Sequence, residues 1–165
     1  MELNIILHEP EIPQNTGSIG RTCMALGAKL HLIQPLGFSL EDKYLKRAGM
    51  DYWRRLNVEC YSDWPTFLAA QPELPLWYFT TKARKCYNEA EFSKRLGMVF
   101  GRETGGLPDT LLEKVPERCL RIPMLPEARS LNLAVTVGIA ACEVLRQHGF
   151  AGLTAADPEK RLKFH

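Results

Sequence analysis

The sequence has little of what marks membrane-bound, disulfide-bonded or metal-binding proteins. No apolar run in its 165 residues approaches the roughly 20 that span a bilayer, and no basic leader precedes the first apolar segment. The five cysteines are odd in number without a C-x-x-C pair, and the four histidines form no H-E-x-x-H. We therefore expect a cytoplasmic protein without membrane contact or bound metal, whose cysteines are reduced and packed in the core.

An excess of charge of one sign is also lacking, and this leaves the kind of partner open. The formal net charge is +2, with 45% hydrophobic and 24% charged residues. These fractions are typical of a globular protein and exclude wholesale disorder. At this length we expect one domain, residues 1–150, followed by a polar tail over residues 151–165.

Short apolar runs alternate with helical patterns along the chain. Strands are predicted over residues 3–8, 30–33, 58–61, 76–79, 98–100 and 120–122. Helices are predicted over residues 15–26, 39–49, 64–70, 108–115 and 131–149, with Asn15 capping the first and Gly27 ending it. Since the strands are apolar throughout, the pattern predicts an α/β fold with a mostly parallel sheet and helices on both faces.

Ligands of such sheets bind beyond the carboxyl ends of the strands, and a first glycine-bearing loop lies there at residues 13–21. Gly17 and Gly20 fall in the opening turns of the predicted helix, with Arg21 one turn beyond Gly17. Glycine costs up to about 1 kcal/mol there relative to alanine. Close approach of a ligand or another backbone would explain that cost, but a tightly packed, capped helix with a solvated arginine explains it too.

Two further loops carry candidate binding groups, and no loop matches a Walker A or G-x-G-x-x-G motif. Residues 100–108 hold three glycines in six positions, which leaves backbone groups free for a flat heterocycle or a carboxylate, or marks only an unusual turn. Residues 122–132 combine prolines and apolar side chains with Ser130 and Asn132. This combination suits an adenosine better than a bare phosphate, although either polar residue could be a simple helix cap.

Basic residues form two groups. The first contains five within thirteen positions, and the second follows a predicted strand. A basic surface is usually only solvated, so these groups alone favour an RNA partner weakly. The groups are Lys43, Lys46, Arg47, Arg54 and Arg55, and then Lys82, Arg84 and Lys85.

In order, the three loops resemble the motifs of the SPOUT superfamily of RNA methyltransferases. The resemblance is carried by Asn15-x-Gly17-x-x-x-Arg21, by Phe100-Gly101-x-Glu103-x-x-Gly106-Leu107-Pro108, and by Ile122-Pro123-Met124 with Ser130-Leu131-Asn132. The opening Glu9-Pro10-x-Ile12-Pro13 and the segment 42–52 are similar to the minimal branch that acts on the tRNA wobble nucleotide.

The resemblance implies a deep C-terminal trefoil knot, a homodimer, and S-adenosylmethionine as the methyl donor without a metal. It implies methylation of the ribose 2′-hydroxyl of the tRNA wobble nucleotide, a cytidine or modified uridine, with S-adenosylhomocysteine as the product. The implied catalytic residues are Arg21, which often comes from the other protomer, Ser130 and Asn132. The implied cofactor contacts are Phe79, Gly101, Ile122, Met124, Ser130 and Leu131, and the expected RNA contacts are Lys43, Lys46, Arg47, Arg54 and Arg129.

The chain departs from this family pattern after Asn132. It continues Leu133-Ala134-Val135-Thr136, where relatives often have a Leu-Ser-Asn-Ala-type helix start. Relatives also often have a tyrosine near the position that Cys142 has in this sequence. This departure keeps open an RNA-binding module of the same fold without catalytic activity. A 2′-O-methyltransferase acting on another tRNA or rRNA position is a further alternative. A Rossmann-type oxidoreductase is disfavoured because the glycine motif is missing.

Overall fold

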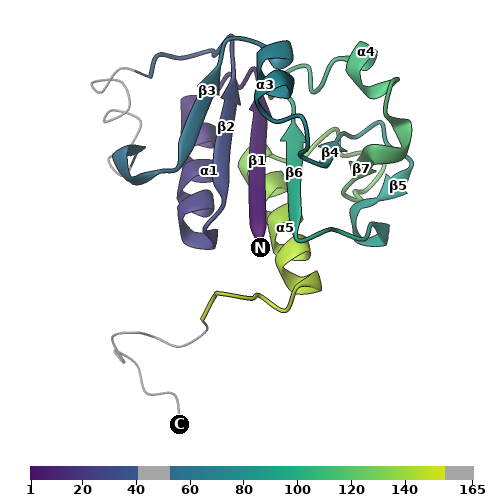
Figure 1. Ribbon diagram of the computed structural model, residues 1–165. Helices are drawn as coiled ribbons and strands as arrows, with labels where there is room; N and C mark the ends of the chain where they lie inside the picture. Colours follow the sequence, from purple (N-terminus) through teal and green to yellow (C-terminus); the bar gives the residue numbers. More distant parts are fainter. Residues whose placement is uncertain (41–52, 155–165) are drawn as a thin grey trace.

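The centre of the molecule is a parallel β-sheet, seen nearly face-on in Figure 1. A computed structural model describes residues 1–40 and 53–154. Within them the sheet has seven strands in the order β3-β2-β1-β6-β4-β7-β5, and every neighbouring pair is parallel. The strands are β1 (Glu2–His8), β2 (Lys29–Ile33), β3 (Val58–Tyr61), β4 (Leu76–Phe79), β5 (Lys85–Cys86), β6 (Arg95–Phe100) and β7 (Cys119–Arg121).

Helices cover both faces of the sheet, which confirms the predicted α/β class. On one face α1 and α5 contact each other over a core that includes Ile19 and Val137. On the other face Phe67 of α3 and Leu112 of α4 pack into a second core, and Figure 1 draws α3 in front of the sheet and α1 behind it. The helices are α1 (Pro13–Leu26), α3 (Trp64–Ala70), α4 (Asp109–Leu112) and α5 (Leu133–Gln147), with the 3₁₀ turns η1 (Trp53–Arg55), η2 (Tyr87–Glu89) and η3 (Pro116–Arg118).

The strand order brings distant loops together. β6 lies between β1 and β4, and β7 lies between β4 and β5. In a parallel sheet all carboxyl ends meet at one edge, so the segments that follow β1, β6, β4 and β7 are neighbours there. The fold therefore gathers the three loops singled out in the sequence.

Most element positions agree with the sequence pattern, and the differences have local causes. Helix α1 ends at Gly27, which has a left-handed φ of 67°, as predicted. It begins at Pro13 with Ile12 as the N-cap residue, so the prediction of Asn15 as the cap is wrong. Strand β5 escaped prediction because two residues carry no periodic pattern. The helix predicted over residues 39–49 lies outside the described residues from position 41.

The expectation that all five cysteines pack in the core is only partly right. All five are free thiols, and Cys23 and Cys119 are buried. Cys60 and Cys142, however, are exposed. Cys60 lies on β3, an edge strand of the sheet, and Cys142 lies on the side of α5 that faces away from the core.

A buried polar network links β1, β2 and β3. His31 is fully buried, with Nε2 3.0 Å from Asn4 Oδ1 and Nδ1 3.1 Å from the Tyr61 hydroxyl. Burial, helped by the Lys29 ammonium, lowers the pKa of His31 to about 4. The imidazole is therefore neutral in the folded protein at neutral pH.

Among the described residues, no helix combines the length and apolar character needed to cross a bilayer. The C-terminal trefoil knot stays a prediction, and so does the polar tail over residues 151–165, which the structure describes only as far as residue 154.

Candidate functional site

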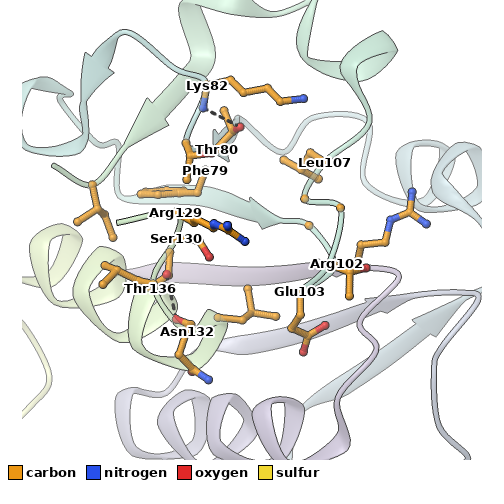
Figure 2. Close-up of a pocket in the computed structure, with 18 of the residues that line it drawn as sticks. Phe79, Thr80, Lys82, Arg102, Glu103, Leu107, Arg129, Ser130, Asn132 and Thr136 are labelled. Carbon is orange, nitrogen blue, oxygen red and sulfur yellow. Dashed lines mark hydrogen bonds between the residues drawn. The ribbon is translucent and has the colours of Figure 1, made fainter. Parts of the chain in front are cut away.

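A cavity of about 540 Å³ lies where β4, β6 and β7 end. Figure 2 shows residues that line it. This volume is in the range of small-molecule sites, roughly 300–1,000 Å³. Its walls come from residues 79–82, 101–107 and 122–136, together with Ile12 and Asn15 at the start of α1. Segments that are far apart in the sequence thus share one site.

Most of the predicted site residues line this cavity. They include all six expected cofactor contacts, Phe79, Gly101, Ile122, Met124, Ser130 and Leu131, and also Asn132. Arg21, the third predicted catalytic residue, is exposed on α1 and does not line the cavity of its own chain. The sequence analysis missed Thr80 and Thr81, although their position just beyond a predicted strand was a usable signal. Lys82, singled out in the sequence only as part of a basic group, also lines the cavity.

Buried apolar side chains form the closed wall of the cavity. The Phe79 ring, at the end of β4, stacks on Phe100 with ring centroids 4.9 Å apart and an interplanar angle of 21°. Leu107 and Leu120 are buried and also line the cavity. Such a wall excludes water and suits a flat, largely apolar ring.

The glycines after β6 allow a tight turn, more than they expose backbone to a ligand. A Cβ at Gly101 would lie 2.1 Å from the carbonyl carbon of Gly106 and 2.3 Å from the nitrogen of Leu107. Gly106 has a φ of +65° and donates its N–H to the carbonyl of Arg102 at 3.0 Å. The second of the alternatives for this loop, a turn with unusual geometry, therefore describes Gly101 and Gly106 better.

Glu103 caps α1 from a different part of the chain. Its carboxylate accepts hydrogen bonds from the backbone N–H groups of Glu11 at 2.8 Å and Ile12 at 3.3 Å. The side chain of Ile12 cannot cap the helix, and Glu103 instead binds the N–H of this N-cap residue and the N–H of the residue before it. A carboxylate at a helix N-terminus is also favoured by the helix dipole.

Two asparagines extend this contact to the third loop. Asn15 Nδ2 donates to Glu103 at 3.0 Å, and Asn132 Nδ2 donates to Asn15 Oδ1 at 2.9 Å. Asn132 Oδ1 accepts the backbone N–H groups of Ala134 and Val135 and so caps α5. The helix-cap alternative for Asn132 is confirmed, and its amide joins α5 to α1. A catalytic part for Asn132 stays a prediction.

A second set of contacts ties the segment after β1 to the loop after β6. Glu11 accepts hydrogen bonds from the backbone N–H of Thr104 at 2.9 Å and from its hydroxyl at 2.8 Å. These bonds lower the pKa of the Glu11 carboxyl. Arg102 Nη1 lies 2.9 Å from Glu9 Oε2. These contacts fix the 101–107 segment of the cavity wall to the residues that follow β1.

Three cations stand around the cavity. Lys82, Arg102 and Arg129 all line it. Arg129 is exposed, and within residues 1–40 and 53–154 it has no hydrogen bond or ion pair. Ser130, beside it, offers a hydroxyl on the cavity wall. In Figure 2 both side chains lie below the Phe79 ring. The site therefore combines an apolar wall with a border that carries three cations and the Glu103 carboxylate.

Of the predicted RNA contacts, the structure locates only Arg129 at the cavity. Lys43, Lys46 and Arg47 lie outside the described residues, and Arg54 falls in η1 with its side chain outside them. Within the part of the chain that the structure describes, no three His, Cys, Asp or Glu side chains gather as metal ligands would.

A parallel α/β fold with a cavity at these strand ends is shared with a known class of enzymes. The family model "SpoU rRNA Methylase family" matches residues 2–142. The chain belongs to this family of methyltransferases.

The chain is also similar to individual members of the family, both in sequence and in structure. The chain is 47% identical over 150 residues to the tRNA (cytidine(34)-2′-O)-methyltransferase of Saccharophagus degradans, covering 90% of this chain and 97% of the relative. A solved structure described as "Structural insights into the 2-OH methylation of C/U34 on tRNA" is 43% identical, with a TM-score of 0.83 over 90% of this chain and 97% of that one. An AdoMet-bound rRNA methyltransferase from Sinorhizobium meliloti is 26% identical, with a TM-score of 0.77 over 88% of this chain and 56% of that one.

Proposed function

We propose that this protein transfers a methyl group from S-adenosylmethionine to the ribose 2′-hydroxyl of nucleotide 34, the wobble position of tRNA. The acceptor is a cytidine or a modified uridine. The observation that carries the proposal is the single cavity built from all three motif-bearing loops. The similarity to C34 and C/U34 methyltransferases over nine-tenths of the chain supports the choice of substrate.

The cavity fits the proposed cofactor in size and chemistry. The stacked Phe79 and the buried Leu107 and Leu120 suit an adenine ring. The Ser130 hydroxyl offers a polar contact to the ribose or the amino-acid end. When bound, the cofactor supplies a methyl group already activated on a sulfonium. The chain therefore has to position and stabilise the acceptor, for which no metal is required.

During the reaction, negative charge develops on the acceptor oxygen, and the protein has to stabilise it. When bound, S-adenosylmethionine would supply the methyl group and leave as S-adenosylhomocysteine, while the acceptor oxygen would pass its proton to solvent water. Arg21 stabilises the developing alkoxide by its positive charge. Action of Arg21 as the general base is less favoured because a guanidinium group gives up its proton only with great difficulty.

We place Arg21 at the cavity of a second copy of the chain, in a homodimer. The side chain is exposed on α1 and does not line its own cavity. Exposed apolar side chains on both helices of this layer support pairing there, since Met24 on α1 is 45% exposed and Val135 on α5 is 51% exposed. Residues 1–150 form the working domain, and the tRNA substrate makes the cytoplasm the expected compartment.

A subunit-mixing experiment tests this arrangement. Purified protein with labelled cofactor should label the ribose of tRNA that lacks the modification. Arg21→Ala should lower the rate about 10²–10³-fold while leaving cofactor binding nearly unchanged. Gly101→Ala should lose most of its activity at a low concentration of S-adenosylmethionine, because its disturbed cavity binds the cofactor weakly. Mixing the two inactive variants should restore activity, because a mixed dimer has one intact cavity facing one intact Arg21.

Four outcomes would count against the proposal. Label on a base would overturn the reaction type. A wild-type rate in Arg21→Ala would remove that residue from the mechanism. If mixing restored nothing although mixed dimers had formed, Arg21 would act on the cavity of its own chain. A protein that bound RNA but no S-adenosylmethionine in calorimetry would instead be a binding module.

A further inference from the structure

Lys82 stands at the border of the cavity, where a carboxylate from another element holds it. The residue follows β4 and lines the cavity, and its Nζ donates to Asp109 Oδ1 at the start of α4. Figure 2 draws the Lys82 side chain along the upper edge of the site, away from Phe79 and Ser130. Its charge is therefore directed to the rim and not to the apolar wall.

The pair between Lys82 and Asp109 is open to solvent. The two side chains are 59% and 61% exposed. An ion pair in this setting stabilises a fold little because water solvates both partners. An anion that arrives from solution can therefore take the place of Asp109 at small cost.

The other cations of the border are held differently. Arg102 pairs with Glu9, whose side chain is only 24% exposed, and this pair belongs to the contacts that anchor the 101–107 loop. Arg129 has no hydrogen bond or ion pair with any residue that the structure describes. Lys82 and Arg129 come from different walls, and both remain available to an anionic ligand.

We propose that Lys82 binds a backbone phosphate of the RNA substrate. Before RNA binds, the Lys82 ammonium is paired with the Asp109 carboxylate, and the phosphate displaces this carboxylate. The inference rests on the proposed function, because it takes RNA as the molecule that approaches the cavity. A ribose that enters the site brings its flanking phosphates to the rim, where Lys82 lies. A lysine ammonium suits such a contact, since it binds phosphate as a point charge from many directions.

Asp109 then sets how selective the contact is. Its carboxylate opposes any single weak anion that competes for Lys82. The phosphates of a nucleic acid offer a higher local charge and release counterions on binding. RNA therefore displaces Asp109 more readily than a single small anion does.

The test compares Lys82→Ala, Asp109→Asn and the double variant in tRNA binding, with S-adenosylhomocysteine present and over a range of salt concentrations. Lys82→Ala should weaken binding about tenfold and reduce the slope of log K against log salt by about one. Asp109→Asn should tighten binding several-fold. The double variant should behave like Lys82→Ala, because Asp109 acts only through Lys82.

Matched controls separate this effect from a general change in charge. Glu113→Gln removes one negative charge close to Asp109, and Lys114→Ala removes one positive charge. Neither residue lines the cavity, and neither side chain has a hydrogen bond or ion pair within residues 1–40 and 53–154. Both variants should bind tRNA nearly as the wild type does. Thermal unfolding checks that every variant is folded.

Two results would overturn the inference while leaving the proposed function intact. If Asp109→Asn bound tRNA no more tightly than Glu113→Gln, the pair would only tie α4 to the loop after β4. If Lys82→Ala weakened binding of S-adenosylmethionine but not of tRNA, Lys82 would contact the carboxylate of the cofactor. A wild-type protein that methylates no tRNA would instead refute the proposed function itself.

Discussion

Gly101 lines the cavity at a position that has no room for a larger side chain. Alanine there would place its Cβ against the backbone of Gly106 and Leu107, and backbone cannot move aside as a flexible side chain can. Opening the turn should cost about 1–3 kcal/mol, as overpacking usually does. We expect Gly101→Ala to bind S-adenosylmethionine at least tenfold more weakly, measured by calorimetry.

Gly105 provides the matched control for this prediction. The three atoms nearest to a Cβ at Gly105 all belong to the Arg102 side chain, with Nε at 3.3 Å, and a side chain can shift more easily than backbone. Gly105→Ala should therefore bind the cofactor nearly as well as the wild type. If both variants bound S-adenosylmethionine with equal affinity, the tight packing of Gly101 against Gly106 and Leu107 would not determine the shape of the site.

His31 makes the stability of the fold depend on pH. Its pKa is about 4 in the folded protein against an ordinary value of 6.5, so the unfolded chain binds more protons between these values. The stabilisation is fully present above pH 6.5 and is lost as the pH falls toward 4, by up to about 3 kcal/mol. Burial also lowers the pKa of His8, which adds to the same trend.

Urea unfolding at pH 7, 5.5 and 4.5 measures this dependence. The free energy of unfolding of the wild type should fall steadily over the series. His31→Gln should be less stable at pH 7, because the contacts to Asn4 and Tyr61 change, but its stability should depend less on pH. The same slope in both proteins would mean that other groups titrate.

The asparagines show what sequence reasoning can and cannot assign to one residue. Asn132 was predicted both as a helix cap and as a site residue, and one amide side chain caps α5 and also lines the cavity. Asn15 was predicted as a cap and is instead the link between Glu103 and Asn132. Local spacing could not show this, because both partners of Asn15 come from distant parts of the chain.

Among the elements, α1 depends on a residue outside itself. Its N-cap residue, Ile12, offers no side-chain acceptor, and Glu103 supplies the oxygens. Glu103→Ala should destabilise the protein by about 1–2 kcal/mol, the usual cost of losing a helix cap. It should also weaken cofactor binding, because the loop after β6 loses its contact with α1.

Glu91→Ala is the control for this prediction. Glu91 is exposed, and in the described part of the chain its side chain has no hydrogen bond or ion pair. In thermal unfolding, the Tm of Glu91→Ala should be close to that of the wild type, and the Tm of Glu103→Ala should be clearly lower. If the two variants melted together, the contact between Glu103 and α1 would not hold the helix.

Element positions were largely predictable because burial on both faces leaves a continuous apolar run. β1 and β6 are such strands, and the pattern located both. The two-residue strand β5 was not predictable, since its place depends on pairing with β7 and not on its own sequence. The prediction of buried thiols failed at Cys60 because nothing in a short strand shows that it lies at an edge of the sheet.

For the whole molecule, the class of fold followed from the alternation of strands and helices, but the strand order did not. That β6 lies between β1 and β4 depends on contacts between distant residues, which no local pattern encodes. The order of the three motifs, through their resemblance to a family, anticipated that their loops meet. The hydrogen bonds of Glu103 that join them were found only in the structure.

The central claim is that these loops form a methyl-donor site serving the wobble ribose. The most direct test is mass-spectrometric mapping of tRNA after reaction with the purified protein and S-adenosylmethionine. We predict one added methyl group, located on the ribose of nucleotide 34. A methyl group on a base, or on a ribose elsewhere with nucleotide 34 unchanged, would contradict the account.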